Sequence, residues 1–366
     1  MRLITKTIAI LLTLLLTPLL TLITAPAIAE EKSIADRTMK LVKTITGDIA
    51  PKSVRASGSG LVSAHNMMYR HSVTIYDAKS MELKVTVPDR VRLSDFGFPR
   101  FPTEVRGAPV EGTYSPDGKY LYVTNYAMYG KGFTKEGTDT CKPSDGYDRA
   151  FLYRIEHTKF TIDKVYRVGV VPKVVEISND NRFILVSNWC SYDISIISTE
   201  EDRVVKTVSI GRYPRGIAIS SDSRFGYLAE MGGSSIHRID LADFSTTRIP
   251  IGANPRALQL SADDSILYAT LNLSGQVVAL DLASQKVIKR AKTGSAARSL
   301  VISDDGSALF VVNYGSGTLA KVRTSDFKVL EKKKVCSEPI GVTFEKTLDR
   351  TWVACYGGAI KVFDNL

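Results

Sequence analysis

The chain has 366 residues, of which 44% are apolar and 23% are charged, with 26 Gly, 14 Pro and only 4 Cys. This is the composition of an ordinary globular protein, and it excludes a disordered chain, a collagen-like chain and a small disulfide-built scaffold. The 48 Lys and Arg residues outnumber the 38 Asp and Glu residues, which gives a formal charge of +10. A charge of this size favours anionic partners without naming one.

The first thirty residues have the pattern of an export signal. Arg2 and Lys6 precede a long apolar run, and Ala27-Ile28-Ala29 is a small-x-small cleavage motif. We therefore predict a signal peptide over residues 1–29 and a mature protein that is secreted, periplasmic or on the cell surface. Because the apolar run would nearly span a bilayer, an uncleaved anchor is the alternative, and membrane contact is expected only through it.

A short motif containing Ser and Asp recurs along the rest of the chain. In most copies a Pro lies six residues before the Ser, and from Pro172 onward the copies are 42, 41, 42 and 42 residues apart. Their first strands alternate apolar and polar residues, as at Ile217 and Ile219, which predicts β-strands rather than helices. Units of four short strands at a spacing of about 40–45 residues are typical of a β-propeller. The copies begin at Pro51, Pro109, Pro172, Pro214, Pro255, Ala297 and Pro339.

The two ends of the chain indicate how the ring closes. The last copy has only three strands, and residues 39–45 resemble the outer strand that residues 203–208 form in the third copy. We therefore predict an all-β fold, a seven-bladed propeller of four-stranded blades in one domain over residues 30–366. The N-terminal strand would complete the seventh blade (3+1), and this closure leaves no exposed sheet edge at the ends of the chain.

Two of the second strands carry a related tetrapeptide, Tyr122-Val123-Thr124-Asn125 and Phe310-Val311-Val312-Asn313. On these residues the chain resembles the YVTN-repeat seven-bladed β-propellers of the exported bacterial type, over residues 38–366. It is more distantly similar to lactonase-type propellers, which implies a charged channel mouth that handles an acidic sugar lactone. The resemblance is specific for the fold and not for a function, because propellers do unrelated jobs.

The insertions and the cysteines are expected on one face of the ring. The insertions span residues 89–107 and 127–148, in connections that share a face with the links between blades. Cys141 lies in the second insertion and Cys190 in the corresponding loop of blade three, whereas Cys336 and Cys355 belong to neighbouring strands of blade seven. We predict the disulfides Cys141–Cys190 and Cys336–Cys355, with buried free thiols as the alternative.

The residue after each marker Pro or Ala stands at the entrance to the innermost strand of its blade. It is basic in five of the seven copies: Lys52, Lys173, Arg215, Arg256 and Arg298. Because innermost strands converge on the central channel, these side chains should crowd its mouth, where acidic neighbours or a bound anion would offset their repulsion. Glu230 and Glu176 are the expected acidic neighbours. The alternative is a structural role, in which each basic residue contacts the adjacent blade.

Other candidates are weaker. Phe98 and Arg100 lie in an aromatic and basic insertion that suits stacking on a sugar or a protein, or a plug over the channel. Trp189 and Tyr213 are two further candidates for ligand binding. His65 and His71 are weak metal-ligand candidates, but we expect neither a metal nor a cofactor.

These patterns favour binding over catalysis. The predicted function is an exported binding or scaffold protein that holds an anionic small molecule, a glycan, an envelope polymer or a protein partner at the basic channel mouth. One alternative is a lactonase-like hydrolase acting on an acidic sugar lactone, with Glu230 or Glu176 as general base. Another is an accessory subunit of an exported redox system. Nucleic acid is not an expected partner, since the chain lacks a long basic track, and we expect a monomer.

Overall fold

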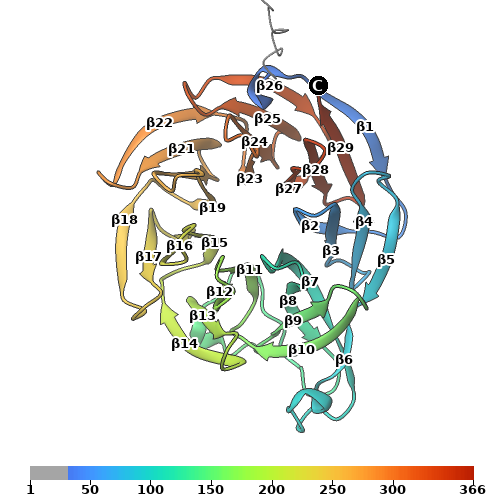
Figure 1. The fold of residues 1–366 in the computed structure, drawn as a ribbon. Helices are drawn as coiled ribbons and strands as arrows, with labels where there is room; N and C mark the ends of the chain where they lie inside the picture. Colours follow the sequence, from blue (N-terminus) through green and yellow to red (C-terminus); the bar gives the residue numbers. More distant parts are fainter. Residues whose placement is uncertain (1–31) are drawn as a thin grey trace, which may run out of the picture. The chain divides into compact units, whose positions relative to one another are not determined.

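The computed structural model of the protein describes residues 32–366, which form one compact unit. The predicted signal peptide over residues 1–29 lies outside the described residues. Seven antiparallel sheets stand in a ring, each with its first long strand toward the centre (Figure 1). The chain is a seven-bladed β-propeller, which confirms the fold predicted from the repeat.

Five of the blades consist of four consecutive strands each. Blade one contains β2 (Pro51–Ala56), β3 (Leu61–Asn66), β4 (Ser72–Asp77) and β5 (Leu83–Pro88). Blade three contains β11 (Pro172–Ile177), β12 (Phe183–Asn188), β13 (Asp193–Ser198) and β14 (Arg203–Ser209). Blade four contains β15 (Pro214–Ile219), β16 (Phe225–Glu230), β17 (Ser235–Asp240) and β18 (Thr246–Pro250). Blade five contains β19 (Pro255–Leu260), β20 (Ile266–Leu271), β21 (Gln276–Asp281) and β22 (Lys286–Lys292). Blade six contains β23 (Ala297–Ile302), β24 (Ala308–Asn313), β25 (Thr318–Arg323) and β26 (Val329–Lys334).

Blades two and seven depart from this plan. Blade two contains β7 (Glu104–Tyr114), β8 (Tyr120–Tyr129), β9 (Phe151–Glu156) and β10 (Thr161–Arg167), and β6 (Arg90–Arg92) pairs with β7 as a fifth strand. Blade seven combines β27 (Pro339–Glu345), β28 (Arg350–Cys355) and β29 (Ala359–Asn365) with β1 (Met39–Ile45). The helices are the short 3-10 segments η1 (Ile34–Asp36), η2 (Leu93–Phe96) and η3 (Pro143–Asp145). Within residues 32–366, therefore, no helix is long and apolar enough to cross a membrane.

The ring closes at the strand that the sequence assigns to the seventh blade. β1 pairs antiparallel with β29, with Met39 opposite Asn365 and Ile45 opposite Ile360. Met39 is buried in the core between blades six and seven, together with Ile34 of η1. The predicted 3+1 closure is confirmed.

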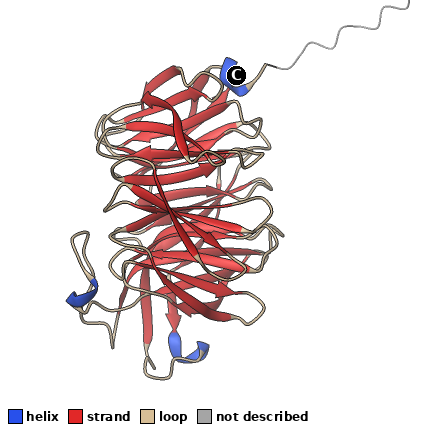
Figure 2. Cartoon of the chain, turned by 90° about the vertical axis from the view of Figure 1, so that its left-hand side faces the viewer, coloured by secondary structure: helices blue, strands red, loops and turns tan. Residues whose placement is uncertain are grey.

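The apolar core lies between neighbouring blades. Because side chains alternate between the two faces of a strand, each blade can bury apolar residues against both of its neighbours. One cluster, for example, joins Ala229 and Ile236 of blade four to Leu267 and Val278 of blade five. Seen from the side, the strands stack between two opposite faces that carry the loops (Figure 2). This packing holds the innermost strands around the central channel.

The recurrent Ser and Asp residues close the turn between the first and second strands. In blade two the Ser115 hydroxyl donates to Asp117 at 2.6 Å, and its oxygen accepts the backbone N–H of Tyr120 at 3.0 Å. The same Ser-to-Asp bond occurs in blades three to six, at 2.5–2.6 Å. The motif is therefore a structural feature of the turn.

The first insertion packs on the outside of blade two. Figure 1 shows this segment, coloured cyan, at the outer rim of the ring beyond β6. Phe98 packs edge-on against Phe151 with ring centroids 5.0 Å apart, and Phe101 stacks on Phe133 at 4.7 Å. These rings form a separate apolar cluster with Val105 of β7. The segment is therefore not a plug over the channel.

Candidate functional site

A cavity of about 600 Å³ occupies the central channel. Its walls come from the first strands of the blades, and its lining includes Arg215, Arg256 and Arg298 at the strand starts. At the other end of the same strands the lining includes Gly58 and Pro116, which belong to the short turns. The cavity therefore extends from the three guanidinium groups toward the face that carries the Ser and Asp turns.

The five basic residues at the strand starts lie together. Burial lowers the pKa of the Lys52 ammonium, and the charges of Lys173 and of the three arginines lower it further. Burial, together with Arg215 and then Arg298, likewise lowers the pKa of Arg256. Lys173, Arg215 and Arg256 are only 5–7% exposed. These five residues, called the cation cluster below, lie close together in a poorly solvated position.

Aromatic rings support three members of the cation cluster. Each cation lies over the face of a ring from a residue within or just after a second strand, a favourable cation–π geometry. The contacts are Lys173 Nζ to the Tyr126 ring centroid at 4.2 Å and to the Trp189 ring at 5.2 Å, Arg298 Cζ to the Tyr314 ring at 3.7 Å, and Lys52 Nζ to the Tyr356 ring at 4.8 Å.

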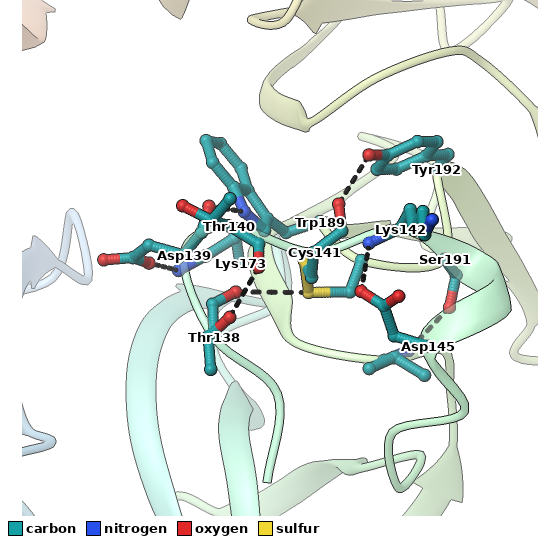
Figure 3. Close-up of a disulfide and its surroundings, with 12 residues drawn as sticks. Thr138, Asp139, Thr140, Cys141, Lys142, Asp145, Lys173, Trp189, Ser191 and Tyr192 are labelled. Atoms are coloured by element: carbon teal, nitrogen blue, oxygen red, sulfur yellow. Dashed lines mark hydrogen bonds and ion pairs between the residues drawn. A yellow bond between two sulfur atoms is a disulfide. The ribbon is translucent and has the colours of Figure 1, made fainter.

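The second insertion brings an acidic residue to the cation cluster (Figure 3). Asp139 Oδ1 lies 3.3 Å from Lys173 Nζ, and the Asp139 carbonyl accepts a hydrogen bond from Trp189 Nε1 at 3.1 Å. Burial would raise the pKa of Asp139, but the positive charge of Lys173 holds it below its usual value. Burial and then Arg215 lower the pKa of Lys173 to about 7, against the opposing effect of Asp139.

A disulfide fixes this loop beside blade three. Cys141 and Cys190 are bonded, with their Cα atoms 5.4 Å apart, and Tyr192 donates its hydroxyl hydrogen to the Cys141 carbonyl. A second disulfide joins Cys336 to Cys355, with Cα atoms 6.2 Å apart. Both predicted disulfides are confirmed. The first one limits the positions that Asp139, two residues away, can adopt.

The acidic neighbours of the cation cluster differ from those expected. Glu111 pairs with Arg215 at 3.1 Å, and Asp139 pairs with Lys173. Glu230 instead contacts His237 at 3.2 Å and Arg248 at 3.1 Å, both in its own blade. The assignment of Glu230 as a neutraliser of the cation cluster is therefore corrected.

Glu176 lies deeper in the channel and is fully engaged there. Its Oε1 and Oε2 accept hydrogen bonds from Arg55 at 2.8 and 2.6 Å, and Thr113 donates to Oε2 at 3.0 Å. These bonds join blades one, two and three across the channel wall. Glu176 therefore forms an ion pair that links neighbouring blades, and its role as a general base stays a prediction.

The Arg55–Glu176 pair supplies a stability prediction. We expect Glu176→Gln to lower the free energy of unfolding by about 1–2 kcal/mol, because an amide cannot replace a bidentate, charge-assisted contact. Urea denaturation followed by tryptophan fluorescence would measure it. Glu201→Gln is the matched control, because Glu201 makes an exposed pair with Arg203 and should change stability by less than about 0.5 kcal/mol. Equal stability of the two variants would contradict the assigned role of Glu176.

The remaining candidates occupy different places. Trp189 lies 5.2 Å from Lys173 and stacks on Tyr213 with ring centroids 4.4 Å apart, so Trp189 contacts the cation cluster and Tyr213 contacts Trp189. Phe98 and Arg100 belong to the rim segment, where Arg100 lies 4.8 Å from the Phe101 ring, and the structure does not bring them to the cation cluster. Their role in ligand binding stays a prediction, at a place apart from the cation cluster.

The two histidines considered as metal ligands contact different partners. His65 Nδ1 lies 2.7 Å from Ser53 Oγ, and burial lowers the pKa of His65 to about 3. His71 Nδ1 lies 2.6 Å from the Gly107 carbonyl oxygen. Within residues 32–366 there is no group of three or more His, Cys, Asp or Glu side chains placed to hold a metal ion.

Sequence reasoning missed the partners of the cation cluster. The signal for the rings was present, since Tyr126, Trp189 and Tyr314 each follow a second-strand Asn. Asp139 precedes the cysteine whose disulfide was predicted, and that bond alone places it beside blade three. Glu111 stands next to Val110, one of the two apolar residues at the basic position of the repeat.

Comparison with known proteins gives a partial likeness. No family model matches this chain. A segment of 128 residues, 34% of the chain, is 28% identical to part of "Antigen Lp49" from Leptospira interrogans serogroup Icterohaemorrhagiae serovar copenhageni (strain Fiocruz L1-130). The match spans 22% of the length of that protein. The likeness agrees with a propeller, whereas membership of the YVTN-repeat family stays a prediction based on two tetrapeptides.

Proposed function

We propose that this protein is a binding or scaffold propeller that holds an anionic ligand or the anionic part of a partner at the cation cluster. The observation that carries the proposal is a surplus of buried positive charge beside a cavity. Lys173, Arg215 and Arg256 are buried in the cation cluster, and two of them line a cavity of about 600 Å³. Such a cavity is within the size range of small-molecule sites.

The hydrogen-bonding state of the arginines supports a ligand. Within residues 32–366, Arg215 Nη1 and Arg298 Nε are buried atoms without a hydrogen-bond partner. Arg256 Nη1 contacts only the sulfur of Met231, at 3.6 Å, and no carboxylate hydrogen bond to Arg256 occurs in the same residues. A buried donor without an acceptor costs free energy, so the oxygens of an anion would supply the hydrogen-bond acceptors that the protein lacks here.

Export is part of the proposal. Two disulfides are typical of proteins that fold outside the reducing cytosol, and the leader pattern of residues 1–29 agrees with this. The word "antigen" in the description of the similar Leptospira protein is compatible with the same location. We therefore propose that the protein acts in the periplasm, on the cell surface or in the medium.

Titration calorimetry with pyrophosphate as the probe would test the binding site. We expect binding to the unmodified protein and a loss of about 100-fold or more in affinity for Arg215→Gln/Arg256→Gln, because two charge-assisted contacts are removed. Lys286→Gln/Arg290→Gln is the matched control, since it removes the same charge from the exposed outer strand β22. Equal weakening by both double variants, or no anion binding at all, would contradict the proposed function.

A further inference from the structure

The rings at the channel mouth are already covered by protein cations. Tyr126 faces Lys173, Tyr314 faces Arg298 and Tyr356 faces Lys52, at 3.7–4.8 Å. A sugar binds aromatic residues through an open ring face, and the cations occupy one face of each of these rings. The Trp189 ring likewise contacts Lys173 and stacks on the ring of Tyr213. At most one face of each of these rings therefore remains for stacking, so the charged groups are the main feature that a ligand meets here.

The cation cluster contains more basic side chains than carboxylates. Five cations face two directly paired carboxylates, those of Glu111 and Asp139. Glu338 is the next carboxylate, held through the Tyr314 hydroxyl at 2.6 Å and close enough to act on Arg298. Basic side chains therefore outnumber their carboxylate partners by two or three, and a bound anion would favour the protonated forms of Lys52 and Lys173, whose pKa values are lowered in its absence. Charges confined to a poorly solvated mouth attract an anion of matching valence most strongly.

The donors that need acceptors lie on adjacent blades. Arg215, Arg256 and Arg298 come from blades four, five and six, and the charges of Arg215 and Arg298 both act on Arg256. Arg215 Nη1 and Arg298 Nε are among the buried nitrogens in residues 32–366 that lack an acceptor. A single compact group with several oxygens can meet neighbouring guanidinium groups at once, as phosphates and carboxylates do.

From these three observations we infer that the ligand is a compact anion with two or three negative charges, of the phosphate or polycarboxylate type, rather than a glycan. The inference rests on the proposed function and narrows it. The ligand sits against the three guanidinium groups, and Lys52 and Lys173 supply further positive charge nearby. An acidic polymer could present the same chemistry through a terminal phosphate or carboxylate group.

The test compares four small ligands on the full-length protein by titration calorimetry. The ligands are pyrophosphate, the tricarboxylate tricarballylate, the monoanionic sugar acid glucuronate and neutral glucose. We expect pyrophosphate or tricarballylate to bind at least about tenfold more tightly than glucuronate, since each additional desolvated ionic contact is worth about that factor. The tighter of the two then distinguishes phosphate from carboxylate recognition. No binding of glucose is expected.

The outcomes separate this inference from the proposed function. Glucuronate binding as tightly as both multivalent anions, with Arg215→Gln/Arg256→Gln abolishing it, would overturn the inference and leave the anion site in place. Binding of none of the three anions would overturn both. Because the ligand ranking is measured on the unmodified chain, it does not depend on whether any variant folds.

Discussion

A chain that starts at Asp48 instead of Lys32 is expected to lose its cooperative thermal transition. The deletion removes β1, so the backbone of β29 loses its outer partner along the whole strand. It also removes Met39, which is 2% exposed, and Ile34 from the core between blades six and seven. Losing one buried side chain of this size costs about 2–5 kcal/mol, and a whole domain has only about 5–15 kcal/mol.

Circular dichroism during heating would measure this effect, with the chain starting at Lys32 as reference. Met39→Asp should destabilise strongly, because it places a charge in the same core, whereas Lys40→Ala on the exposed side of β1 should change little. A chain from Asp48 that melts as cooperatively, and at the same temperature, as the reference would show that β1 does not close the ring.

The fold could be predicted almost fully because each blade repeats the same local sequence pattern. The marker Pro, the alternating strand and the Ser-to-Asp turn recur at fixed distances, so an error in one copy is corrected by the others. The position of β1 followed from a missing outer strand in the last copy. The disulfides followed from the neighbouring positions of their loops. Each inference depends on the repeat and not on long-range packing.

The site could be predicted only where it belongs to the repeat. Lys173 and Arg256 stand at a repeated position, and the structure brings them together. Glu230 ends a second strand, but its carboxylate contacts His237 and Arg248 on the next two strands of its own blade. The direction in which the Glu230 side chain points depends on packing within its own blade, and the repeat does not specify this packing.

The insertions were harder still, since they occur once. β7 and β8 continue past the blade as a paired hairpin, with Arg106 opposite Tyr129, and β6 joins its edge. The aromatic residues of the first insertion therefore cover this hairpin at the rim. Only a long-range contact, between Phe98 and Phe151 for example, separates that outcome from a plug over the channel.

Arg256→Met is expected to stabilise the ligand-free protein by about 1–4 kcal/mol. The guanidinium group is buried, the charges of Arg215 and Arg298 act on it more strongly than those of Glu111 and Asp139, and its hydrogen-bond contact within residues 32–366 is to a thioether. Replacing a poorly paired buried charge by an apolar side chain of similar length removes both the desolvation cost and the repulsion. A Met at this position can pack against Met231. Arg290→Met, on the exposed side of β22, is the control and should change stability by less than about 0.5 kcal/mol.

The free energy of unfolding of Arg256→Met, measured in chloride buffer without multivalent anions and again with pyrophosphate, decides whether the central cations exist for a ligand. We expect a more stable protein without pyrophosphate and a smaller gain on adding it than the unmodified chain shows. A variant that is less stable in both buffers, with an undiminished response to pyrophosphate, would mean that Arg256 simply holds neighbouring blades together.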